Sequence, residues 1–214
     1  MSLDAEDAET LVGLAERRII RGGTPLFQKG DPGDRLYGVV TGCLKVCATN
    51  LEGREVTFAV LSAGDIVGEL AVTSAHPRSA TVIAVSDSEL ASIERKRLDS
   101  VMTRRPAVLS ALVEASATTV RRLTDRAEDA AFLSLDARLA KTLVELSQRI
   151  GQPRNAGTEI RFRQQDLADM LSASRESVNK RLRDWEDHTF LQLRRGTIVV
   201  RDIDALRNKS ADST

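Results

Sequence analysis

Cysteine and histidine are scarce in this sequence, with two of each among 214 residues. Cys43 and Cys47 lie in a segment typical of a β-strand, where a rise of about 3.3 Å per residue separates them by roughly 13 Å, too far for a disulfide bond. No third or fourth ligand lies nearby in the sequence, which argues against a bound metal. We therefore interpret both cysteines as small hydrophobic residues of a sheet.

The residue patterns of common enzymes are also missing. His76 and His188 are far apart in the sequence, and there is no nucleophile elbow, P-loop or metal-binding cluster. We therefore predict that the protein is not an enzyme.

Long apolar runs are absent too, and none approaches the roughly 20 residues that a membrane span requires. Residues 1–20 are rich in acidic side chains and lack the basic start and apolar core of a signal peptide. The sequence predicts a cytoplasmic protein with no membrane partner.

Charge is balanced overall but unevenly distributed. Residues 1–136 contain 16 basic and 20 acidic side chains, whereas residues 137–214 contain 15 basic and 11 acidic ones. An acidic first part and a basic second part suggest that any binding of a polyanion belongs to the C-terminal part.

Residues 19–95 predict an all-β module. Short apolar or alternating runs such as RLYGVV and SELASIE are separated by turn signals such as KGDPGDR, NLEG and SAGD. A spacing of roughly 8–12 residues between strands favours a sandwich or roll over alternating β/α units. Short helices are predicted at residues 5–17, before the module, and at residues 95–106, after it.

A long helix is predicted from Pro106 to about residue 131, because proline suits the first helical position. One narrow seam along it follows spacings of four and three: Leu109, Val113, Ser116, Val120, Leu123, Ala127 and Ala130. Such a seam with polar residues around it predicts pairing with a second copy of the helix, as a homodimer. Packing against its own domain is the alternative.

The C-terminal part predicts a winged helix-turn-helix. QQDLADML and RESVNKRLRDWED predict two helices joined by the short turn SAS, and FLQLRRGTIVVRD predicts a hairpin. Ser174 is placed to cap the second helix, on which Val178, Leu182 and Trp185 face inward. The side chains predicted to face outward are Arg175, Glu176, Asn179, Lys180 and Arg183. A solvated charged face is the alternative.

The order of β-roll, long helix and winged helix resembles the cyclic-AMP receptor protein / fumarate-nitrate regulator (Crp/Fnr) family of bacterial transcription factors. GEL followed by PRSA resembles the phosphate-binding cassette of cyclic-nucleotide domains, and SASRESVNKRL resembles the recognition helix. The resemblance implies an α+β fold. Its three parts are an effector domain at residues 1–105, a dimerisation helix at residues 106–131 and a DNA-binding domain at residues 132–214.

The resemblance implies a role for each cassette residue. Glu69 accepts the ribose 2′-OH, and Arg78 pairs with the cyclic phosphate. The other cassette residues implied in the site are Gly68, Leu70, Ser79 and Ala80, of which Leu70 is expected to face the core. Gly68 and Ala80 keep the backbone close to the phosphate, and Ser79 adds a donor. An ion pair between Glu69 and Arg78 alone is the alternative.

The dimer helix departs from the family pattern at two implied nucleotide contacts. Where the family's cyclic-AMP sensor has a threonine against the adenine amino group, this chain has Leu123, and Thr124 follows where the sensor has serine. Cyclic AMP is the favoured effector and cyclic GMP is also compatible. A ligand-independent or other-effector regulator, and a cyclic-nucleotide module without DNA function, are the alternatives. No metal or iron–sulfur cluster is expected.

The recognition helix implies contacts to DNA. Arg175 and Glu176 match the family's base-reading residues, and Lys180 replaces a second arginine, losing its bidentate fork. Asn179 belongs to the same outward face. The residues expected at phosphates are Arg163, Gln164, Ser174 and Ser177. The expected partners are double-stranded DNA with a two-fold-symmetric site, a second copy of the chain, and RNA polymerase.

Overall fold

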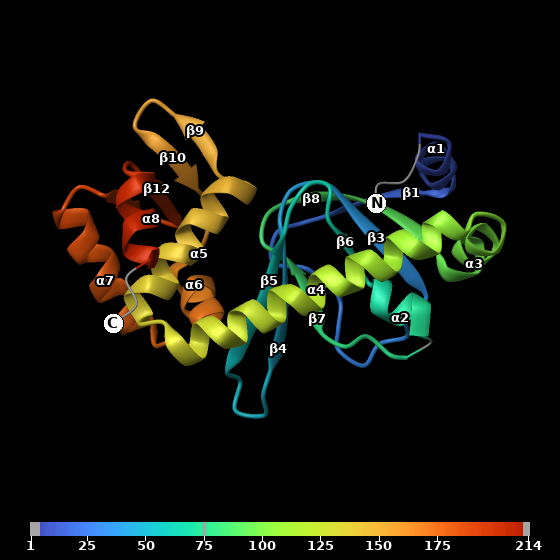
Figure 1. The fold of residues 1–214 in the computed structure, drawn as a ribbon, viewed down its shortest axis with the longest axis horizontal. Coiled ribbons are helices and arrows are strands. Elements are labelled where there is room, and N and C mark those ends of the chain that lie inside the picture. The colour runs from blue at the N-terminus through green and yellow to red at the C-terminus, as the bar shows by residue number, and fades with distance from the viewer. Residues whose placement is uncertain (1–4, 75, 212–214) are drawn as a thin grey trace. The chain divides into compact units, whose positions relative to one another are not determined.

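The computed structural model describes residues 5–74 and 76–211 (Figure 1). Packing divides the chain into two compact units. The first comprises the chain up to Ala48 together with Val60–Leu123, and the second comprises Thr49–Ala59 and the chain from Thr124 onward. The division into three parts stays a prediction.

Two four-stranded sheets form the β-roll. The first has the order β1-β8-β3-β6, and its antiparallel strands are Glu16–Ile20, Ser88–Glu94, Arg35–Thr41 and Ile66–Val67. The second has the order β2-β7-β4-β5, formed by Pro25–Phe27, Thr81–Ala84, Leu44–Thr49 and Glu55–Leu61. Cys43, just before β4, and Cys47, within it, are buried thiols that form no disulfide among the described residues, which agrees with their interpretation as small hydrophobic residues.

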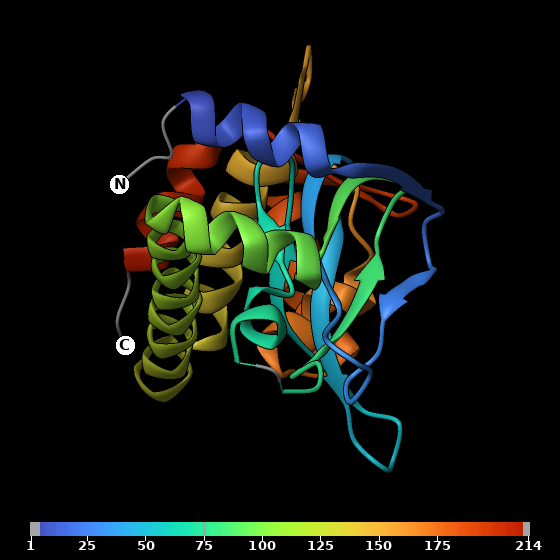
Figure 2. The ribbon, with the colours of Figure 1, turned by 90° about the vertical axis from the view of Figure 1, so that its right-hand side faces the viewer.

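Four helices accompany the sheets in the first unit. Their bounds are Ala5–Leu14 (α1), Glu69–Ser74 (α2), Arg95–Arg104 (α3) and Pro106–Phe132 (α4), the last of which continues into the second unit. Figures 1 and 2 show α1 beside α3. Val72 of α2, Leu98 of α3 and Leu112 of α4 belong to one buried apolar cluster, so the three helices share a core.

The helix α4 begins at Pro106 as predicted, because its first N–H has no helical partner in any case. Val108 and Leu112 are its buried residues. Four apolar residues of the predicted seam are exposed in the single chain: Leu109, Val113, Val120 and Leu123. An apolar stripe on a polar helix is the pattern of a surface that pairs with another.

The second unit contains the winged helix-turn-helix. Its helices are Leu135–Ile150 (α5), Gln164–Leu171 (α6), Arg175–Asp187 (α7) and Ile203–Ala211 (α8). Its sheet has the order β11-β12-β10-β9, formed by Leu191–Arg194, Thr197–Val200, Gly157–Ile160 and Gln152–Arg154. The structure confirms α6, α7 and the β11–β12 hairpin, while β9 and α8 are not evident from the sequence.

Candidate effector site and DNA-reading helix

The cassette that follows β6 is built around one glycine. Gly68 has φ +92°, a backbone conformation that residues with a side chain rarely adopt. A Cβ at this position would also lie 2.4 Å from Nη1 of Arg78. Gly68 is therefore required both by the turn into α2 and by the close approach of the Arg78 guanidinium.

Arg78 is buried, with 3% of its surface exposed. Its Nη1 donates to the Gly68 carbonyl at 3.2 Å, and its Nη2 donates to the Arg35 carbonyl at 2.7 Å. The guanidinium lies 4.2 Å from the centre of the Phe27 ring, and its carbon lies 5.7 Å from that of Tyr37. Carbonyls and rings thus fix the guanidinium, and its Nη2 forms a long ion pair of 3.9 Å with the carboxylate of Asp34.

One donor of that guanidinium is unused. The Nε–H of Arg78 is buried and has no hydrogen-bond partner among the residues that the structure describes. Burial lowers the pKa of Arg78, since desolvation disfavours its charged form. A buried cation with a spare donor is suited to receive an anion.

Glu69 begins α2 and is also buried, with 6% of its surface exposed. Burial raises the pKa of its carboxyl group, while hydrogen bonds from its own backbone and that of Gly68, a hydrogen bond from the Thr119 side chain and the charge of Arg78 oppose the shift. No ion pair between Glu69 and Arg78 within 4 Å is found in the described part of the chain, and the alternative of a simple ion pair is therefore not supported.

The other cassette residues differ from expectation in one respect. Leu70 is 40% exposed, so the prediction that it faces the core is wrong. The segment after Gly68 is a helix inside the module that was predicted to be all-β, and a helix brings Glu69 and Val72, three residues apart, to the same face. Ser79 is exposed and Ala80 is half-buried.

The predicted base contacts on α4 are accessible, since Leu123 and Thr124 are both exposed in the single chain. Thr119 of α4 lowers the pKa of the Glu69 carboxyl group, an influence that the sequence reasoning missed. Its only signal in the sequence is its position four residues before Leu123, on the same side of the helix.

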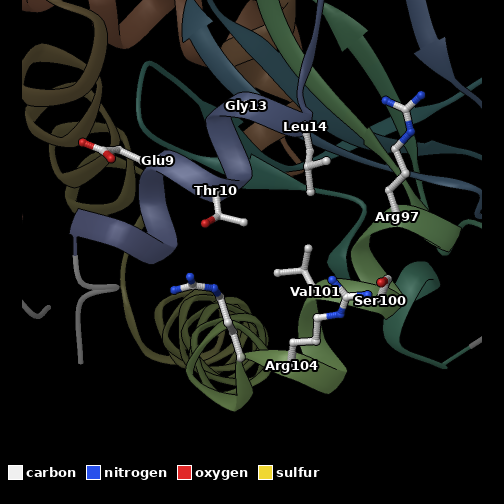
Figure 3. A pocket seen from close by; sticks show the side chains of 9 residues that line it. Glu9, Thr10, Gly13, Leu14, Arg97, Ser100, Val101 and Arg104 are labelled. Atoms are coloured by element: carbon white, nitrogen blue, oxygen red, sulfur yellow. The ribbon is translucent and has the colours of Figure 1, made fainter.

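A cavity of about 780 Å³ lies elsewhere in the first unit, between α1 and α3 (Figure 3). Its wall includes Thr10 and Leu14 from α1 and Val101 and Arg104 from α3. None of the predicted nucleotide contacts lines it. The cassette chemistry and this cavity are therefore separate features.

The turn between α6 and α7 is held by backbone hydrogen bonds and by a serine cap. Ser172 ends α6 in the left-handed conformation at φ 50°, and Ala173 N donates to the Ala168 carbonyl at 3.1 Å. Ser174 then caps α7, its Oγ accepting from Ser177 N at 3.1 Å. The cap confirms the predicted start of the recognition helix.

The recognition helix has the predicted two faces. Val178, Leu182 and Trp185 are completely buried at 0% exposure. Four of the five residues predicted to face outward are exposed: Arg175, Glu176, Lys180 and Arg183. Asn179 corrects the prediction, because it is half-buried and its Oδ1 is buried without a hydrogen-bond partner among the described residues. It follows the buried Val178 and lies at the edge of the inward face.

The predicted phosphate contacts surround the start of both helices. Arg163 precedes α6 and is exposed, and Gln164, its first residue, is half-buried. Ser174 donates to Ser177 Oγ at 2.9 Å, so both hydroxyls already serve the cap. Arg195 and Gly196 form the exposed turn of the β11–β12 wing.

Two models of known protein families match separate parts of this chain. The model of the cyclic nucleotide-binding domain matches residues 17–105, and that of the Crp-like helix-turn-helix domain matches residues 137–209. A cyclic AMP receptor protein of Thermus thermophilus is 30% identical over 203 residues, which cover 94% of this chain and 90% of that protein. The chain belongs to the Crp/Fnr family of transcription regulators.

Two further Crp/Fnr relatives agree. A CRP-like cAMP-activated global transcriptional regulator of Mycobacterium tuberculosis is 28% identical over 190 residues, covering 88% of this chain and 85% of that protein. The structure of CLP, a c-di-GMP responsive global regulator of Xanthomonas campestris, superposes with a TM-score of 0.79 at 27% identity, covering 92% and 99% of the two chains.

Family membership decides several predictions. The chain is a DNA-binding transcription regulator with a cyclic nucleotide-binding domain, not an enzyme. A cyclic-nucleotide module without DNA function is thereby set aside. Among residues 5–74 and 76–211, no helix is long and apolar enough to cross a membrane. The expected absence of a metal or iron–sulfur cluster stays a prediction.

Proposed function

We propose that this chain is a homodimeric transcription regulator whose binding to DNA is controlled by a cyclic nucleotide, with cyclic AMP favoured and cyclic GMP as the alternative. The observation that carries the proposal is the buried Arg78 with a spare Nε–H, held beside a glycine that leaves room for its guanidinium. Such a donor suits a singly charged cyclic phosphate, and Ser79 and Ala80 follow it directly.

Glu69 supports a sugar hydroxyl as the second anchor. Its carboxylate is buried and ionisable, and a ribose 2′-OH is a neutral donor that can approach it without adding charge. Relatives that are named for cyclic AMP support this nucleotide in particular. At the predicted base contact, Leu123 offers no acceptor to an adenine amino group.

The exposed α4 seam supports a homodimer. Leu109, Val113, Val120 and Leu123 present an apolar stripe on an otherwise polar helix, and a second copy presents the same stripe. Two recognition helices about 34 Å apart would then read half-sites one turn of DNA apart. RNA polymerase is the further partner that we propose for such a regulator.

A second candidate is a regulator with another effector or none. Leu123 favours it, since the base-facing position has lost its polar group. The c-di-GMP responsive relative shows that the fold also serves other ligands. Under this hypothesis the cassette keeps its fold but does not recognise cyclic AMP or cyclic GMP.

Calorimetric titration of the full chain with cyclic AMP and cyclic GMP separates the two candidates. We expect binding at micromolar levels, roughly −8 kcal/mol. Arg78→Ala should weaken it by at least 10- to 100-fold, because a hydrogen bond to a charged group contributes about 1.5–3 kcal/mol. Arg17→Ala, which alters an exposed ion pair with Glu89, is the control. Absence of heat and of thermal stabilisation with either nucleotide would refute the effector assignment.

A further inference from the structure

The cavity between α1 and α3 is formed by one face of each helix. Thr10 and Leu14 lie four positions apart on α1, and Ser100 and Arg104 lie four positions apart on α3, so each pair shares a side of its helix. Figure 3 shows Thr10 and Leu14 pointing from α1 towards Val101 of α3. At about 780 Å³, the cavity falls within the range of roughly 300–1,000 Å³ that small-molecule sites occupy, so it has room for a small organic ligand.

The floor of the cavity is apolar. Val101 is buried, with 8% of its surface exposed, and Leu14 packs against the same apolar cluster. That cluster also contains Leu98 of α3 and Val108 of α4, so the floor is part of the core of the first unit. An apolar group that enters the cavity leaves water for these side chains, which is favourable in proportion to the apolar area that it buries.

Three arginines line the cavity, and they differ in their partners. Arg105 forms ion pairs with two carboxylates of α1, and Nη1 of Arg97 lies 3.7 Å from Oε1 of Glu16. Arg104 is exposed and has no hydrogen bond or ion pair to any residue that the structure describes. Of the three, Arg104 therefore keeps its charge available to a ligand.

The surroundings of Arg104 favour an anion. Glu9 is the acidic side chain on the wall, and Figure 3 shows its carboxylate pointing away from Arg104. The same view shows Ser100 beside the Arg104 guanidinium. A carboxylate can accept hydrogen bonds from this hydroxyl and this guanidinium together, and the charge of the arginine strengthens the contact. The cavity thus combines an apolar floor with donors for one anionic group.

We propose that this cavity is a second ligand site, which binds a carboxylate with an apolar tail of the medium-chain fatty acid type. Its head pairs with Arg104 and Ser100, and its tail lies on Leu14 and Val101. The site goes beyond the proposed function, because none of the predicted nucleotide contacts lines it. A ligand held by both α1 and α3 binds the folded chain only, and it therefore raises the stability of the protein.

Calorimetric titration of the full chain with octanoate tests the site. We expect a Kd of about 0.1 mM, which about ten non-hydrogen atoms can supply. Hexanoate should bind about 10- to 20-fold more weakly, because each buried methylene contributes roughly 4-fold in affinity. Acetate lacks the tail and 1-octanol lacks the charge, so each should bind at least about 10-fold more weakly than octanoate. Either of them binding as tightly as octanoate would overturn the proposal.

A first pair of variants tests the head of the ligand. Arg104→Gln keeps a polar side chain and removes the charge, so it should weaken octanoate binding about 5- to 10-fold. Lys96→Gln is the control, because Lys96 is exposed on the same helix and does not line the cavity. It should bind octanoate like the wild type. Equal octanoate binding by Arg104→Gln and Lys96→Gln would refute the role of Arg104.

A second pair tests the tail. Thr10→Trp places a ring in the space above Val101 and should weaken octanoate binding at least about 10-fold, because the tail loses its contacts. Val12→Trp is the control, because Val12 is 72% exposed on α1 and does not line the cavity. Melting temperatures close to that of the wild type would show that both variants fold.

Competition with cyclic AMP separates this site from the cassette. We expect saturating cyclic AMP to leave octanoate bound, and displacement would place octanoate in the cassette and overturn the proposal. If the chain binds octanoate but neither cyclic AMP nor cyclic GMP, the proposed function fails and the cavity site stands.

Discussion

The two working regions of this chain use the same pair of residue types in opposite settings. In the effector site, Glu69 and Arg78 are buried and held by backbone groups and rings. On the recognition helix, Glu176 and Arg175 are exposed at the start of α7. Burying a charged side chain lowers the stability of the fold and leaves its polar atoms accessible to one ligand only. An exposed charged side chain costs little stability and gains its partner when the ligand binds.

The largest effect should come from disrupting the predicted pairing along the seam of α4, a helix whose residues belong to both units. In a homodimer, Val120→Glu places two like charges opposite each other across the two-fold axis. We expect sedimentation to show monomers and specific DNA binding to be lost. Val12→Glu on α1 is the control, because Val12 is 72% exposed and lies outside the seam. An intact dimer of Val120→Glu would refute the seam.

Arg175→Ala tests the exposed charges at the start of the recognition helix. The loss of a bidentate contact to a base costs about 1–3 kcal/mol, which is roughly 10- to 100-fold in specific DNA affinity. Nucleotide binding and thermal stability should not change, since exposed side chains away from caps and cores contribute within about 0.5 kcal/mol. Arg207→Ala on α8, where Arg207 pairs with Asp204, is the control for a lost surface charge in a mobility-shift titration.

The same contrast explains what the sequence could predict. The bounds of α6 and α7 follow from the sequence, because apolar residues recur at helical spacing and Ser174 provides a cap. The exposed charges of α7 follow from that periodicity. Asn179 does not, because a residue at the edge of the inward face can belong to either side.

The effector site was predictable only by its residue types. Glycine next to a carboxylate, followed by arginine, identifies the cassette, but α2 has six residues and no clear period. Leu70 was therefore expected inside, where Val72 lies. The influence of Thr119 on the pKa of Glu69 was missed because the two residues are 50 positions apart in the sequence, and a threonine on the polar part of a helix carries no local signal of it.

Glu69→Gln sharpens the comparison through stability. Because burial raises the pKa of Glu69, the native state binds its proton more readily than the unfolded chain. The stability from this group is present at pH below its unfolded pKa and is lost as pH rises through its folded pKa. Glutamine keeps an acceptor without the charge, so the variant should melt higher than the wild type at pH 7.

The pH series and a matched variant complete this test. A change of 1 kcal/mol in the free energy of unfolding corresponds to roughly 2–4 °C in melting temperature for a chain of this size. The difference in melting temperature between Glu69→Gln and the wild type should shrink as the pH falls from 7 towards 4. Glu176→Gln on the exposed helix should melt like the wild type at both pH values. Equal melting of Glu69→Gln and the wild type at pH 7 would mean that the buried carboxylate carries no cost.

The smallest expected effect concerns Leu123, which lies both on the seam and at the predicted base contact. An apolar side chain there should help two α4 helices pack without ligand, and we therefore expect appreciable specific DNA binding by the ligand-free protein. Leu123→Thr removes apolar area from each helix, which weakens their packing by about 1 kcal/mol per chain at 25 cal/mol per Å². It also offers an acceptor to an adenine amino group. Mobility shifts should show roughly 5-fold weaker ligand-free binding and a steeper response to cyclic AMP. A wild-type protein that has no measurable specific DNA binding at low salt, and that cyclic AMP rescues fully, would contradict this role for Leu123 and leave its family membership intact.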